Sequence, residues 1–133
     1  MLREDAIKKH RAMWNWIAEQ IEKYQRTMNI DILKAYFLKQ QGDDTLDMQL
    51  YENCYLCCYT TVVCKNCPLL WPSESDSLMC LYSDKITDGD KTTGGYNKGL
   101  YVECYMLADG YDWQLQASLC RKIANLPERE TSK

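Results

Sequence analysis

The sequence predicts one compact α+β domain over residues 1–133, mainly α-helical, with a small zinc-bound β-hairpin or knuckle. Three observations support this fold class: apolar residues recur at helical spacing towards both ends, two C-x2-C units lie six residues apart in the middle, and no repeat or linker divides the chain. A chain of 133 residues suits a single domain and buries about two thirds of its unfolded surface. We expect the helices to pack around the zinc knuckle, residues 54–80.

The first predicted helix covers residues 4–26. Glu4 and Asp5 lie in its first turn, where the helix dipole favours negative charge. Residues at spacings of three and four form one apolar stripe, which should face the core. The stripe consists of Ala6, Ile7, His10, Met13, Trp14, Ile17 and Ile21. Trp16 lies outside the stripe and should meet a different element.

His10 is the only histidine, and it lies on the stripe one turn before Trp14. Imidazole suits a zinc ligand or a proton shuttle, but the chain has enough thiols to saturate a metal ion without it. We therefore favour a buried histidine that makes one hydrogen bond and packs against Trp14.

A second helix is predicted over residues 30–41. Asn29 or Asp31 can cap its N-terminus, and Gly42 is a natural residue for its C-terminal end. The following residues 46–51 alternate like a strand but are few enough to be helical instead.

Residues 59–63 are β-branched and aromatic, which predicts an extended segment. Such a segment fits a small hairpin that brings the flanking cysteine pairs to one point. Residues 83–99 contain four of the six glycines and few apolar residues, which predicts a mobile loop or a loose hairpin.

Helical spacing returns in two predicted helices, residues 100–108 and 111–126, with a break near Gly110. Cys104 and Cys120 fall on the apolar faces of these helices. Because buried cysteine behaves as a small hydrophobe, we expect both residues in the core rather than on a metal.

The two C-x2-C units predict one structural Zn²⁺ site. Structural zinc is usually tetrahedral with thiolates supplied as two close pairs, and a tight turn places both sulfurs of such a unit on one ion. Cys58 is left out because adjacent residues rarely face the same ion, and Cys80 is the alternative ligand in place of Cys64. The predicted ligands are Cys54, Cys57, Cys64 and Cys67.

Four thiolates leave a metal no open position for catalysis, so we expect a protein that is not an enzyme. A thiol oxidoreductase that uses Cys54 with Cys57, or Cys57 with Cys58, is the remaining enzymatic hypothesis. Thioredoxin-like chemistry usually has a βαβ context, however, and the sequence around this pair indicates none.

Charge and hydropathy limit the classes of partner and the cellular compartments that we expect. A net charge of −3 and a pI near 5.2 argue against a nucleic-acid binder that depends on neutralising phosphates. No window approaches the roughly 18 apolar residues of a membrane span, and the N-terminus has no signal-peptide pattern. We therefore expect a cytoplasmic protein, in which eight reduced cysteines favour metal binding over disulfides.

The ordered motifs resemble a group of small zinc proteins encoded by phages and mobile elements of Gram-positive bacteria. The similarity covers most of the chain except residues 30–41 and 83–99. The motifs are His10-x3-Trp14-x-Trp16, Cys54-x2-Cys57, Cys64-x2-Cys67-Pro68, Cys80, and Ile123-Ala124-x-Leu126-Pro127.

Among these proteins the chain looks like a type II-A anti-CRISPR metalloprotein, a class that inhibits Cas9. The resemblance implies a zinc-stabilised scaffold that binds Cas9 in the cytoplasm of the host bacterium and blocks loading of target DNA, without direct contact with nucleic acid or membrane. It identifies no contact residue. The alternative is a zinc-knuckle nucleic-acid-binding phage regulator, for which Lys65, inside the second cysteine pair, would contact phosphate.

Overall fold

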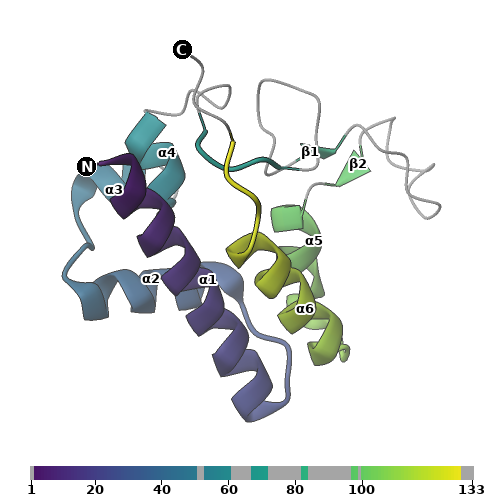
Figure 1. The fold of residues 1–133 in the computed structure, drawn as a ribbon. Helices are drawn as coiled ribbons and strands as arrows, with labels where there is room; N and C mark the ends of the chain where they lie inside the picture. The colour runs from purple at the N-terminus through teal and green to yellow at the C-terminus, as the bar shows by residue number, and fades with distance from the viewer. Residues whose placement is uncertain are drawn as a thin grey trace.

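The computed structural model describes residues 2–50, 53–60, 67–71, 82–83, 97–98 and 100–129, and it confirms the predicted, mainly helical fold (Figure 1). The elements are α1 (Arg3–Tyr24), α2 (Ile30–Gln41), α3 (Leu46–Leu50), α4 (Tyr55–Thr60), β1 (Tyr82–Ser83), β2 (Asn97–Lys98), α5 (Leu100–Met106), a 3-10 turn (Leu107–Asp109) and α6 (Trp113–Ala124).

Helix α1 is the central element of the fold. It packs mainly against α6 on one side and against α2 and α4 on the other (Figure 1). All seven residues of the predicted apolar stripe are buried, and Ala18 joins them. The helix ends two residues earlier than predicted because Gln25 adopts a left-handed backbone conformation, with φ of 50°. Trp16, outside the stripe, meets Phe37 of α2 at a ring-centroid distance of 5.8 Å.

Helix α2 begins and ends as predicted. The side chain of Asn29 accepts a hydrogen bond from the Ile32 amide at 3.1 Å, which satisfies one of the free N–H groups of the first turn. Gly42 ends the helix with φ of 73°, a conformation that glycine adopts without strain, and its amide bonds to the carbonyl groups of Leu38 and Lys39.

The chain between α2 and the second cysteine pair is more helical than predicted. Residues 46–50 form α3, so the helical alternative for this segment is correct. The predicted extended segment 59–63 is wrong at Tyr59 and Thr60, which form the last turn of α4. The Thr60 hydroxyl donates to the carbonyl of Leu56 at 3.1 Å, which accommodates a β-branched residue inside the helix. Residues 61–63 lie outside the described part of the chain.

The described strands lie at the ends of the segment for which a loose hairpin was one of two predictions, and not between the cysteine pairs. β1 and β2 pair antiparallel with Tyr82 opposite Lys98 and Ser83 opposite Asn97. This pairing lies at the ends of segment 83–99, where a mobile loop or loose hairpin was predicted; the residues between the strands lie outside the described ranges. The predicted hairpin that joins the two cysteine pairs is not confirmed.

The C-terminal helices are shorter than predicted. The predicted helix 100–108 is α5 followed by a 3-10 turn, and the predicted helix 111–126 is α6 alone. Helix α6 begins where the Asp112 carboxylate accepts from the Leu115 amide at 3.0 Å, and it ends at Asn125. Because an aspartate cap fixes the first turn, Tyr111 remains outside the helix.

One buried glutamine joins three parts of this helical core. Gln116 of α6 is fully buried and accepts from the Met28 amide at 2.8 Å. Its own amide group donates to the carbonyl of Met28 at 2.8 Å and to that of Cys104 at 3.1 Å. The side chain therefore connects the α1–α2 turn, α5 and α6.

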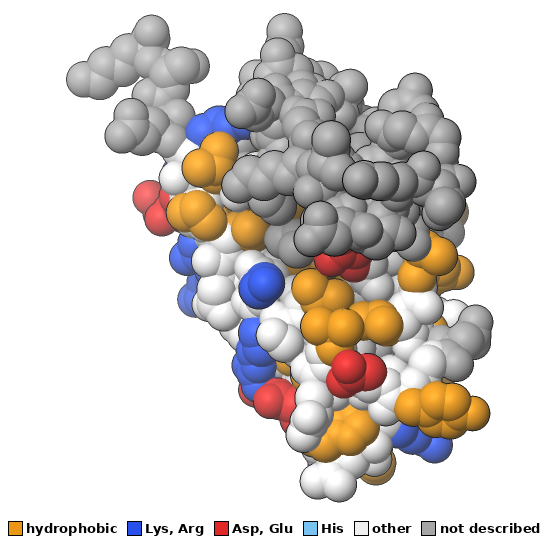
Figure 2. Space-filling view, turned by 90° about the vertical axis from the view of Figure 1, so that its right-hand side faces the viewer, with side chains coloured by type: hydrophobic (Ala, Val, Ile, Leu, Met, Phe, Trp, Pro, Cys, Tyr) orange, Lys and Arg blue, Asp and Glu red, His pale blue; other side chains and the backbone are white. Residues whose placement is uncertain are grey.

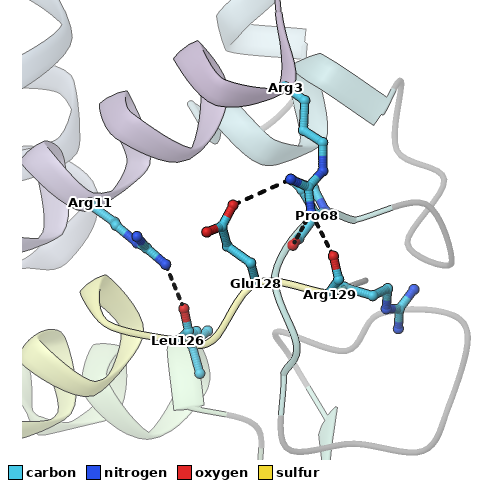
Figure 3. A network of polar contacts seen from close by, with 6 residues as sticks. All are labelled: Arg3, Arg11, Pro68, Leu126, Glu128 and Arg129. Atoms are coloured by element: carbon cyan, nitrogen blue, oxygen red, sulfur yellow. Dashed lines mark hydrogen bonds and ion pairs between the residues drawn. The ribbon is translucent and has the colours of Figure 1, made fainter. Parts of the chain in front are cut away.

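The C-terminal segment returns to the start of the chain. Leu69 forms an isolated antiparallel bridge with Glu128, supported by bonds from the Leu70 amide to Pro127 at 2.8 Å and from the Arg129 amide to Pro68 at 2.7 Å. Two arginines of α1 hold this pairing in place (Figure 3). Arg3 bonds to Pro68, Glu128 and Arg129, and Arg11 bonds to Leu126.

Within the described ranges, no helix combines the length and the apolar character that crossing a membrane would require.

Candidate metal centre

The first cysteine pair lies at the start of α4. Cys54 immediately precedes the helix and Cys57 lies in it, so the C-x2-C spacing brings both thiols to the same side of one helical turn. The Cys57 thiol donates a hydrogen bond to the Cys54 sulfur, and this bond is the main reason that the pKa of Cys54 is lowered to about 6. Burial opposes the shift, whereas the charge of Lys34 and the amides of Cys57 and Leu56 add to it. A thiol with this pKa is largely thiolate at neutral pH, which is the form that binds metal.

Cys67 lies close to this pair. Burial raises the pKa of the Cys67 thiol, although the Leu69 amide and the Trp71 indole N–H both donate to its sulfur. The charge of Cys54 raises it further, so the two sulfurs are near enough to interact electrostatically. A cation between them would remove that repulsion.

The structure therefore brings some of the predicted ligands together, and it does not describe the others. Cys54 and Cys57 are in contact and Cys67 is their neighbour, whereas Cys64 and Cys80 lie outside the described residues. In the part of the chain that is described, no group of three or more His, Cys, Asp or Glu side chains is arranged to hold a metal ion. The four-thiolate zinc site stays a prediction.

Cys58 lies one residue beyond Cys57 on the same helix. Successive helical residues point about 100° apart, and Cys58 packs against the hydrophobic core. Cys54 packs against the same core, so the omission of Cys58 from the predicted ligand set stays a prediction.

Lys34 is the charged residue of this region that the sequence analysis missed. It is only 3% exposed, and its ammonium group lies 4.7 Å from the centroid of the Tyr101 ring. Its charge lowers the pKa of both Cys54 and His10. The pattern of α2 contains the signal, because Lys34 lies four residues after Ile30 and four before Leu38, on the buried face of the helix.

His10 is a core residue, as predicted. It is fully buried, its Nε2 atom lies 3.0 Å from the Ile123 carbonyl, and its ring packs 6.4 Å from Trp14. Trp71 contacts the same ring edge-on at 6.2 Å. Burial is the main cause that lowers the pKa of His10 to about 4, so the imidazole is neutral at pH 7, with Nε2–H donating to Ile123.

Two polar anchors position the cysteine segments. Asp43, directly after α2, accepts from the Tyr55 hydroxyl at 2.8 Å and pairs with Lys9 of α1 at 3.2 Å, which fixes the start of α4 next to Cys54. On the other side, the Arg3 contacts and the bridge to Glu128 hold the segment that follows Cys67 (Figure 3).

A second candidate site is the apolar groove between α5 and α6, which we call the α5–α6 surface. Figure 2 views this side of the molecule and shows hydrophobic side chains gathered there with acidic groups beside them. Met106 and Leu115 are 56% and 45% exposed. The groove is lined by Glu103, Met106, Leu107, Leu115 and Leu119.

Comparison of the chain with models of known protein families, with curated proteins and with solved structures found no match.

Proposed function

We propose that this protein acts by binding another protein through the α5–α6 surface, and that the partner is Cas9 of a type II-A CRISPR system. The exposed apolar side chains of this surface carry the proposal, because contiguous apolar patches on monomers commonly mark interaction sites. Methionine, here the half-exposed Met106, is among the residue types enriched in interfaces. The choice of Cas9 rests on the resemblance of the ordered motifs described above.

In this proposal the bound protein blocks loading of target DNA, in the cytoplasm of the host bacterium. Cas9 holds its guide–target duplex in a positively charged channel. This chain has a net charge of −3, and Glu103 lines its apolar groove. Its negative charge would therefore be attracted to the positive charge of Cas9.

The same proposal includes one structural Zn²⁺ held by Cys54, Cys57, Cys64 and Cys67, with Cys80 as the alternative to Cys64. The lowered pKa of Cys54 supports it, and so does buried Lys34, whose charge offsets the negative charge that several thiolates collect. Zinc in this role stabilises the fold and takes no part in a reaction.

Size-exclusion co-elution with type II-A Cas9, with and without guide RNA, tests the proposal. We expect a stable complex and slower cleavage of target DNA. Leu115→Glu should weaken binding at least about tenfold, because a charge would be buried in the centre of the interface. Leu50→Glu is the matched control: Leu50 is 75% exposed on α3, on the other side of α1 (Figure 1), and its change should leave binding intact.

Two results would overturn the proposal: failure to co-elute with any of several type II-A enzymes, or equal loss of binding in both variants. Gel shifts at a series of salt concentrations test the alternative function, nucleic-acid binding. Affinity that depends on phosphate contacts falls steeply as the salt concentration rises. Salt-dependent binding of nucleic acid by the free protein would make that alternative the better explanation.

A further inference from the structure

A pair of cysteines outside the candidate metal centre lies at the contact between α5 and α6. Cys104 of α5 and Cys120 of α6 are both fully buried, and their sulfur atoms are 3.0 Å apart. The sequence places both residues on apolar faces but does not indicate that they touch. A disulfide bond has a length of about 2.05 Å, so its formation needs the sulfurs to approach by about 1 Å.

The surroundings of this pair favour sulfur–sulfur chemistry over metal binding. The described residues contain no group of three or more metal-binding side chains, and the nearest polar partner of Cys104 is the Gln116 carbonyl, 3.7 Å from its sulfur. The Gln116 side chain is occupied by Met28 and the Cys104 carbonyl. Two thiols in contact with no third ligand beside them can form a bond with each other.

The fold also holds the two sulfurs in a constant relationship. The three hydrogen bonds of Gln116 tie α5 and α6 to the α1–α2 turn, and the Gln116 amide group donates to the carbonyl of Cys104 itself. Mutual hydrogen bonding with Cys104 is the main cause that raises the pKa of Cys120 far above its usual range, and burial adds to it. The Cys120 thiol is therefore protonated, and because both sulfurs are fully buried the pair is unreactive until α5 opens locally.

We propose that Cys104 and Cys120 are a site of reversible oxidation, at which a low-molecular-weight disulfide converts the two thiols into an intramolecular disulfide that links α5 to α6. One thiolate attacks a sulfur of the reagent, forms a mixed disulfide and releases one reagent thiol. The second cysteine then attacks the protein sulfur of that mixed disulfide and releases the other reagent thiol. The protein loses two electrons and two protons, and the reagent gains them as two thiols.

The inference is independent of the proposed function, although the new bond would lie under the α5–α6 surface. It would close a short loop, from residue 104 to residue 120, around the 3-10 turn. A cross-link in this position restricts the unfolded chain and should stabilise the oxidised protein.

The test is oxidation of the intact chain by oxidised glutathione, followed by acid quenching, denaturation, alkylation with iodoacetamide, tryptic digestion and mass spectrometry. Residues 99–121 form one tryptic peptide that contains Cys104 and Cys120 and no other cysteine. Before oxidation this peptide should carry two alkyl groups. After oxidation it should carry none and be lighter than the unlabelled reduced peptide by two hydrogens.

Two variants complete the test. In Cys104→Ser, Cys120 should be alkylated or carry one glutathione after the same treatment, and the intramolecular disulfide should be absent, whereas Cys58→Ser, a change at a cysteine outside this pair, should leave the pairing intact. Oxidation should also raise the thermal midpoint of the wild type by several degrees and leave that of Cys104→Ser unchanged. An oxidised wild type that still carries two alkyl groups on this peptide, or a midpoint that falls on oxidation, would overturn the inference.

Discussion

The Arg3 guanidinium donates a hydrogen bond to the carbonyl oxygen of Arg129 at 2.6 Å, across 126 residues of sequence. The same side chain contacts the Pro68 carbonyl at 3.3 Å and pairs with Glu128 at 3.3 Å (Figure 3). A residue in the first turn of α1 thus fastens both the C-terminal segment and the segment that follows Cys67.

Replacing Arg3 should therefore lower stability. We expect Arg3→Ala to reduce the free energy of unfolding by about 1–2 kcal/mol, mostly through the lost bonds to carbonyl groups, since the half-exposed ion pair with Glu128 contributes little. Urea denaturation measures the change. Lys8→Ala, at an exposed position of the same helix, should stay within about 0.5 kcal/mol of wild type. Equal losses in the two variants would contradict this role of Arg3.

The stability of the protein should depend on the neutrality of His10. Because burial lowers the pKa of His10 from 6.5 to about 4, the unfolded chain binds a proton between these values that the folded protein does not. The free energy of unfolding should therefore fall by up to about 3 kcal/mol as the pH drops from 6.5 to 4, and His10 should add no pH dependence above that window.

The difference between wild type and His10→Gln isolates this effect from the carboxylates, which titrate in both proteins. Urea denaturation at pH 7, 5.5 and 4.5 provides the values. The wild type should lose stability more steeply than the variant, and parallel pH profiles would show that His10 is not held neutral by the fold.

Removal of metal tests the cysteine cluster directly. Purified protein should contain about one zinc per chain, and a chelator should unfold at least the segment around α4, because structural zinc contributes on the order of 10 kcal/mol in small peptides. Cys54→Ser should lose the metal, whereas Cys58→Ser should retain it, since Cys58 points about 100° away from its neighbour Cys57 on α4. Metal analysis with circular dichroism measures both. Retention of zinc by Cys54→Ser would exclude Cys54 as a ligand.

Gln116 should be among the residues least tolerant of apolar substitution. We expect Gln116→Leu to lower the free energy of unfolding by about 2–4 kcal/mol, because it leaves backbone groups of Met28 and Cys104 buried without their partner. Gln114→Leu, at an exposed position of the same helix, should change it by less than about 0.5 kcal/mol. A small effect at Gln116 would mean that water replaces its bonds.

Much of the helical framework could be predicted from the sequence because the signals are local. The stripe of α1 has the helical period over many residues, and Asn29 and Gly42 are residue types with a strong preference for helix ends. The prediction failed at Tyr59 and Thr60, where strand propensity is weak compared with the burial of Tyr55 and Leu56 on the same short helix.

The candidate sites depended on tertiary structure to a greater degree. The contact between Cys54 and Cys57 follows from spacing alone, but the nearness of Cys104 to Cys120 depends on how α5 packs against α6. The α5–α6 surface was not predicted either, because the face of a helix that remains uncovered is decided by the other elements. Lys34 was missed because a lysine is rarely buried.

The fluorescence of Trp71 reports on the docking of residues 67–71. Its indole is 5% exposed, donates to the sulfur of Cys67 and packs edge-on against His10, so its emission depends on whether residues 67–71 are docked on α1. Release of that segment would move the indole into water and shift its fluorescence to longer wavelength. The chain therefore carries its own optical reporter at the point where the cysteine cluster, the C-terminal pairing and the central helix meet.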